Sequence, residues 1–196
     1  MYSAGMSMST SERLIEATRE LLWERGYVGT SPKAVQQAAG AGQGSMYHHF
    51  AGKPDLALAA IRRTAEEMGA AAEALLGGEG SAYDRIEAYL LHERDVLRGC
   101  PVGRLTMDPE VIARPELRAP VEEVLGRLRA RLAAVVQEGL DEGELNCPLD
   151  PAEIAATVVA TLQGGYVLAR ATDSRAPFDS AVRGLLALLA PRAAQG

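Results

Sequence analysis

Apolar residues recur at helical spacing along almost the entire chain. In the first such segment Leu14, Ala17 and Leu21 fall on one face of a helix, while glutamates occupy the opposite face. No segment alternates apolar and polar residues over a length that would make a half-buried strand. The sequence therefore predicts an all-α fold.

Glycine, proline and hydroxyl residues divide this pattern into about nine helices. The first helix begins after a cap at Ser9 or Thr10 and stops at Gly26. Prolines, including Pro120, are expected near helix starts or between helices, where they do not interrupt the backbone hydrogen bonds of a helix. The predicted helices cover residues 10–25, 32–39, 43–50, 53–76, 83–97, a short element around 102–112, 116–139, 151–171 and 177–189.

Composition excludes several classes of protein. The formal charge of −6 argues against a surface that is basic throughout, so any contact with nucleic acid must be local. Two cysteines, Cys100 and Cys147, are too few for a secreted disulfide-rich framework, and no signal-peptide pattern is present. The most apolar stretch, residues 154–162, falls short of the ~20 residues of a membrane span. We expect a cytoplasmic protein that does not enter a membrane.

A helix followed by two short helices around a glycine-containing turn is the layout of a helix-turn-helix, whose second short helix enters the DNA major groove. At the start of that helix Gln43 and Ser45 flank Gly44. Glutamine and serine side chains can form hydrogen bonds with base edges, and a glycine lets the protein backbone approach the DNA closely. These three residues are the predicted base contacts.

Phosphate contacts are expected next to them. Tyr47, His48 and His49 offer hydrogen-bond donors, which typically reach phosphate oxygens. Lys53 begins the next helix, where its charge and the free N–H groups can engage a phosphate together. Residues 1–63 contain seven basic and five acidic side chains, so this part is slightly positive on an otherwise acidic chain. We expect DNA affinity to fall with salt.

Residues 10–58 carry a set of motifs that resembles the DNA-binding segment of TetR-family transcriptional regulators. The motifs are Thr30-Ser31-Pro32-Lys33-Ala34-Val35, then Ala39-Gly40, then Gly44-Ser45-Met46-Tyr47-His48-His49-Phe50-Ala51-Gly52-Lys53. The resemblance implies an all-helical homodimer, a ligand pocket in the C-terminal body and ligand-controlled binding to double-stranded operator DNA. By motif position it implies backbone contacts for Ser31 and Lys33, base contacts for Gln43, Gly44 and Ser45, and phosphate contacts for Tyr47, His49 and Lys53.

The chain departs from the family pattern at three positions. Gln36 replaces a small alanine, and Ala41 and Gly42 replace a valine and a hydroxyl cap. Because glycine offers no side-chain oxygen as a cap, we expect the second short helix to be less ordered before DNA binds.

The predicted domains are a helix-turn-helix DNA-binding domain at 10–55 and a helical ligand-binding and dimerisation domain at 56–190, after a flexible tail at 1–9. In an apolar bundle, pocket and core residues look alike. The candidate ligand contacts each place a polar or polarizable group on an apolar helix, and a role as core filler is equally plausible for them. They are Tyr89, His92, Met107, Gln163 and Tyr166.

The last two predicted helices are apolar over more than one face, with residues such as Val158, Leu162, Leu185 and Leu188. A two-fold interface with a second copy would bury the extra face, and such a dimer matches a palindromic operator. A monomer with one thick core is the alternative.

We interpret the sequence as a ligand-responsive regulator, a repressor released from its operator by a small apolar or aromatic effector, without a cofactor. The rival is a helical small-molecule-binding or scaffold protein that never binds DNA. An enzyme is the weakest hypothesis, because no nucleophile, base and orienting group can be placed together and no metal-ligand set appears. His48 and His49 are neighbours on a helix and point about 100° apart, so a metal site shared by the two would need ligands from elsewhere in the chain.

Overall fold

The computed structural model describes residues 8–145 and 150–190. Within these ranges the chain forms nine α-helices and one 3-10 helix, and no strand. The predicted all-α fold is confirmed. Most of the predicted N-terminal tail and Cys147 lie outside the described residues.

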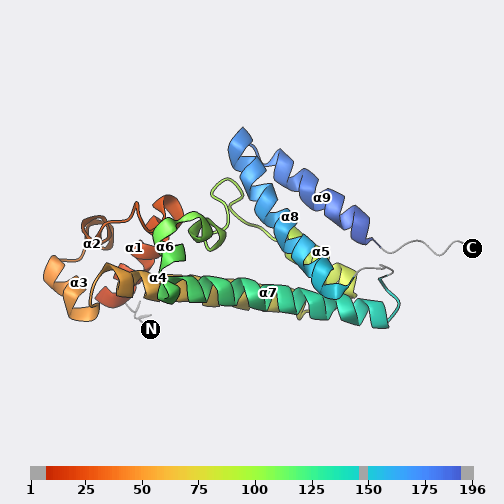
Figure 1. The fold of residues 1–196 in the computed structure, drawn as a ribbon, viewed down its shortest axis with the longest axis horizontal. Helices are drawn as coiled ribbons and strands as arrows, with labels where there is room; N and C mark the ends of the chain where they lie inside the picture. Colours follow the sequence, from red (N-terminus) through yellow and green to blue (C-terminus); the bar gives the residue numbers. More distant parts are fainter. Residues whose placement is uncertain (1–7, 146–149, 191–196) are drawn as a thin grey trace, which may run out of the picture. The chain divides into compact units, whose positions relative to one another are not determined.

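The helices follow the predicted order, and Figure 1 shows their course. Their bounds are α1 Thr10–Arg25, α2 Pro32–Ala39, α3 Gln43–His49, α4 Lys53–Leu76, α5 Ala82–Leu91, the 3-10 helix η1 Gly103–Met107, α6 Pro109–Ala113, α7 Pro115–Asp141, α8 Pro151–Thr172 and α9 Ala176–Leu189.

The chain divides into two compact units. The first unit contains the residues up to Ala65 together with Pro101–Val121, and the second contains Glu66–Cys100 and the chain from Glu122 onward. Both α4 and α7 begin in the first unit and end in the second. The division into a DNA-binding and a ligand-binding domain at residue 55 concerns function and stays a prediction.

The start of the first unit agrees closely with the sequence signals. Ser9 caps α1 and forms a capping box with Glu12, whose carboxylate accepts from the Ser9 N–H at 2.8 Å. Gly26 ends α1 at φ 74, a conformation that favours glycine. The core of α1–α3 and the start of α4 is built from Leu14, Leu21, Val35, Ala39, Met46, Phe50 and Leu56.

The fifth helix is shorter than predicted, because it ends at Leu91 rather than at residue 97. His92 leaves the helical conformation, with φ −58 and ψ 150. The carbonyl of Tyr89 lies 2.6 Å from Nδ1 of His92 and accepts an N–H of Arg94 at 2.5 Å. Side chains thus supply the hydrogen bond to a carbonyl in the last turn of α5 that a further helical turn would otherwise have supplied.

The element predicted around 102–112 is two separate helices. Asp108 lies between them and caps α6, with its Oδ1 accepting from the N–H groups of Glu110 at 3.1 Å and Val111 at 3.3 Å. The expectation for Pro120 is wrong, because this buried proline lies inside α7. It leaves the Glu116 carbonyl without the usual intrahelical donor.

In the second unit, α8 and α9 pack side by side and share a core with α5 and α7 (Figure 1). By length and composition α8 is the one described helix that could cross a membrane, so its apolar segment is longer than the predicted run at 154–162. A core helix passes the same test, and Ile154, Val158 and Leu162 on α8 are buried within the unit. The feature is therefore weak evidence for a membrane span.

Candidate nucleic-acid interface

Two side-chain contacts hold α2 and α3 in place. Nε of Arg13 on α1 donates to the carbonyl of Ala39 at 3.2 Å, which satisfies the C-terminal end of α2. The amide Nε2 of Gln36 lies 3.5 Å from Sδ of Met46, so the residue that departs from the family pattern contacts α3. The helix pair is consequently positioned by polar contacts as well as by its core.

The turn between α2 and α3 depends on glycine at one point. Gly40 has φ 59 and ψ 37, the left-handed conformation, and the Ala41 N–H donates to the Gln36 carbonyl at 3.0 Å. Gly42 is the N-cap of α3 and makes no side-chain cap hydrogen bond. The predicted absence of a side-chain cap is thus confirmed, whereas the looser order expected before DNA binds stays a prediction.

The third helix has an inner and an outer face. Met46 is fully buried and Phe50, its C-cap, is 8% exposed. The outer residues face solvent, and Tyr47 is 52% exposed. Exposed outer residues are Gln43, Gly44, Tyr47, His48 and His49, with Ser45 partly buried. A Cβ added to Gly44 would meet no atom within 4 Å, so this position lies open.

The two candidate backbone contacts on α2 are also exposed. Oγ of Ser31 accepts from the Ala34 N–H at 3.1 Å and caps the helix. Lys33 lies in its first turn. Both side chains are therefore available at the surface beside α3, which belongs to the same compact unit.

Lys53 is partly buried against Tyr27, a residue that the sequence did not single out. Its Nζ lies 4.0 Å from the centroid of the Tyr27 ring, a cation–π contact. Desolvation lowers the pKa of Lys53, while the charge of Asp108 opposes this shift. Asp108 was also missed, since no motif marks it. Its Oδ2 accepts from the Val28 N–H at 2.9 Å and joins two segments of the first unit.

A cavity of about 400 Å³ lies in the second unit between α4, α5 and α7. Its lining includes Met68, Ala72, Tyr89, Val124, Leu128 and Arg131. Of the predicted ligand contacts, only Tyr89 is part of this wall.

The other four predicted ligand contacts have different surroundings. His92 contacts the ring of Tyr89, with centroids 5.6 Å apart, and Tyr166 packs on Phe178 at 5.0 Å. Gln163 is partly buried on α8. Met107 lies in the first unit and is 84% exposed, so it is not near the other predicted ligand contacts, which lie in the second unit.

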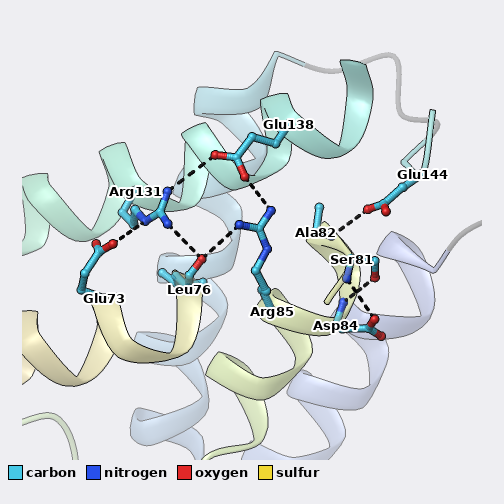
Figure 2. Close-up of polar contacts among 9 residues, drawn as sticks. All are labelled: Glu73, Leu76, Ser81, Ala82, Asp84, Arg85, Arg131, Glu138 and Glu144. Atoms are coloured by element: carbon cyan, nitrogen blue, oxygen red, sulfur yellow. Dashed lines mark hydrogen bonds and ion pairs between the residues drawn. The ribbon is translucent and has the colours of Figure 1, made fainter. Parts of the chain in front are cut away.

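An arginine clamp joins the ends of the helices around the cavity (Figure 2). The Leu76 carbonyl, in the last turn of α4, accepts from Arg131 at 3.1 Å and from Arg85 at 3.4 Å. Arg131 also pairs with Glu73 at 3.1 Å, and Arg85 pairs with Glu138 at 2.6 Å. Figure 2 shows both guanidinium groups converging on that carbonyl. The end of α4 is thus fixed to α5 and α7.

A three-helix unit that presents a short polar helix at its surface defines the class of helix-turn-helix DNA-binding proteins. Comparison with known proteins agrees with the geometry. The sequence profile of the tetR family of bacterial regulatory proteins matches residues 14–60, and that of the tetracyclin repressor-like C-terminal domain matches residues 81–185.

Individual relatives cover nearly the whole chain. An uncharacterised HTH-type transcriptional regulator of Mycobacterium tuberculosis is 30% identical over 91% of this chain and 93% of its own. The HTH-type transcriptional repressor AcnR of Corynebacterium glutamicum is 23% identical over 85% and 84%. The crystal structure of the regulatory protein TetR from Rhodobacter sphaeroides has a TM-score of 0.80 at 28% identity and covers 91% of this chain and 97% of that one. This protein belongs to the TetR family of transcriptional regulators.

Proposed function

We propose that this regulator is a cytoplasmic repressor that binds a palindromic operator as a homodimer and leaves it when a small apolar or aromatic molecule occupies the cavity. The observation that carries the DNA-binding part is the division of α3, whose inner face is anchored by Met46 while its outer face is exposed. On that face Gln43, Gly44 and Ser45 would read base edges. Ser31, Lys33, Tyr47, His49 and Lys53 would contact the phosphate backbone.

Exposed apolar side chains on the last two helices support the homodimer. Val167 and Leu168 on α8 are 68% and 52% exposed, and Leu188 on α9 is 85% exposed. Apolar side chains of this size that stay exposed on two packed helices are candidates for burial in an interface. A two-fold contact through α8 and α9 would bury them, and two copies related in this way would match two operator half-sites about one helical turn apart.

The cavity and the clamp together support control by a ligand. Met68 and Ala72 on α4 line the cavity, and the clamp fixes the end of the same helix at Leu76. Because α4 continues to Lys53, a ligand that displaces α4 would alter the start of the helix as well. The effector must bind the non-operator conformation more tightly than the operator conformation, since equal affinity would shift nothing.

Selection of DNA fragments from a random pool by the purified protein tests the proposal. We expect a palindromic consensus with half-sites about 10 base pairs apart. In the variant Gln43→Ala the preference should relax at one base pair of each half-site, whereas Arg129→Gln, at an exposed position of α7 away from the proposed dimer contact, should keep the full consensus. Selection of no sequence at all would favour a ligand-binding protein that does not contact DNA. Equal loss on every sequence from Gln43→Ala would contradict its base-reading role.

A further inference from the structure

Arg94 has an unusual set of partners for a partly buried arginine. Its guanidinium donates to the Tyr89 carbonyl at 2.5 Å and contacts the His92 ring, and its charge opposes the rise that burial causes in the pKa of Tyr166. All of these partners are neutral groups. The Nε atom of Arg94 is buried and has no hydrogen-bond partner among the residues that the structure describes. A cation in this position retains unused capacity to donate hydrogen bonds.

Three other arginines of low exposure are paired with carboxylates. Arg19 pairs with Glu16 at 2.8 Å, Arg85 with Glu138 at 2.6 Å and Arg131 with Glu73 at 3.1 Å. None of the ion pairs formed within residues 8–145 and 150–190 includes Arg94. Burying a cation without a counter-charge costs desolvation free energy. In a binding site a ligand of opposite charge offsets that cost.

Aromatic rings surround this cation. Its Cζ lies 5.6 Å from the centroid of Tyr89 and 5.8 Å from that of Phe178, and Tyr166 packs on Phe178. Gly165 permits this packing, since a Cβ there would approach Cδ2 of Phe178 to 2.9 Å. Burial raises the pKa of Tyr89 to about 12, so this phenol is neutral and adds no negative charge beside Arg94.

Tyr89 connects the cation to the cavity. Its carbonyl and ring contact Arg94, and the same residue lines the cavity of about 400 Å³. Apolar side chains such as Met68, Val124 and Leu128 form much of the remaining wall, and the charged residues Glu66, Glu73, Arg127 and Arg131 complete it. A charged anchor beside a chamber with a mostly apolar wall suits a molecule with one anionic end and an apolar body.

We infer that Arg94 binds the carboxylate of an organic acid whose apolar part occupies the cavity lined by Tyr89. This assignment rests on the proposed function, in which that cavity holds the effector, and it adds the chemical class of the ligand. The planar guanidinium would donate through its free N–H groups to the carboxylate oxygens. The three aromatic rings would exclude water and strengthen these charge-assisted bonds.

The test compares acids with their uncharged counterparts. The full-length protein is titrated calorimetrically at pH 7.5 and fixed salt with benzoate, 1-naphthoate and octanoate, and with the amide of each acid. We expect at least one acid to bind about ten-fold or more tightly than its amide, as hydrogen bonds to a charged group allow. If no acid is preferred over its amide, the inference is overturned. This comparison uses the unmodified protein and needs no variant.

The variant Arg94→Gln then assigns the preference to one side chain. It should bind the preferred acid no more tightly than the amide, while its affinity for the amide stays near that of the unmodified protein. The matched control Arg183→Gln removes an exposed arginine of the same unit and should keep the preference for the acid. An acid preference that survives in a folded Arg94→Gln protein would overturn the assignment. The assignment would also be overturned if sulfate bound as tightly as the acids, because sulfate has no apolar part to occupy the cavity.

An operator-binding assay separates this inference from the proposed function. Acids that bind through Arg94 but leave operator affinity unchanged would support the carboxylate site and contradict ligand-controlled release. Neutral compounds that release the operator, with no preference for any acid, would support release and overturn the carboxylate site.

Discussion

The ammonium group of Lys53 lies 4.0 Å from the centre of the Tyr27 ring, so the first residue of α4 is held over the turn that follows α1. The charge of Asp108 favours the protonated form of this lysine, because it opposes the lowering of the Lys53 pKa by desolvation. A prepositioned lysine at a helix N-terminus is well suited to a phosphate, because the N–H groups of the first turn point the same way.

Replacing Lys53 tests that role. We expect Lys53→Gln to weaken binding to operator and unrelated DNA alike, and to reduce the slope of log affinity against log salt by about one. Fluorescence anisotropy at several salt concentrations measures both. The control Arg129→Gln, at an exposed position of α7, should leave the slope unchanged. A loss confined to the operator would instead assign Lys53 to base reading.

Gly44 allows folding and DNA binding to be separated. A Cβ at this position would meet nothing within 4 Å, and alanine is a better helix former, so Gly44→Ala should raise the free energy of unfolding by about 0.5–1 kcal/mol. It should nevertheless weaken operator binding if DNA approaches this backbone closely. Gly126 in α7 is equally open, and Gly126→Ala should stabilise without affecting operator binding. Urea denaturation and anisotropy measure the two effects. Unchanged affinity in Gly44→Ala would show that the DNA stays away from this position.

Asp108 should be important for the stability of the first unit. Its carboxylate accepts from the backbone of Val28, Glu110 and Val111, and the residue is 8% exposed. Asp108→Ala leaves the Val28 N–H without its acceptor and α6 without its cap, so we expect a loss of about 1–3 kcal/mol in urea denaturation. The loss of unfolding free energy in Asp108→Ala is compared with that in Asp95→Ala, which replaces an exposed aspartate of the other unit. A loss below about 0.5 kcal/mol for Asp108→Ala would contradict the predicted importance.

The imidazole of His92 should make stability depend on pH. Burial, together with the neighbouring charge of Arg94, lowers the pKa of His92 from its ordinary value of 6.5. The unfolded chain therefore takes up a proton at higher pH than the folded chain does, and stability falls as the pH drops below 6.5. In His92→Gln this part of the loss should disappear. Urea denaturation between pH 7.5 and 5.5 measures the difference, and identical pH profiles for the two proteins would exclude the effect.

The sequence was most informative where local rules decide the structure. The bounds of α1, α2 and α4 match the predictions because capping residues, prolines and glycines mark their ends directly. The buried positions of α3 could also be predicted, since Met46 and Phe50 share a face at a spacing of four.

Contacts between distant segments could not be predicted in the same way. The end of α5 depends on Arg94 and His92 folding back on Tyr89, and the place of Asp108 depends on Val28, eighty positions away. Arg94 itself belongs to no periodic pattern. Only the structure shows that it lacks a carboxylate partner within the described chain, and that Met107, chosen for its polarizable sulfur, is on the surface.

The two faces of α3 have a consequence for how such a regulator can change. Met46 and Phe50 hold the helix to the protein, whereas Gln43, Gly44 and Tyr47 make no contribution to that core. Under the proposed function, substitutions at the three outer positions would alter which promoter is bound while the anchoring residues stay the same. A few substitutions on the outer face would then change the genes that the protein regulates, and the proposed ligand site in the second unit would stay unchanged.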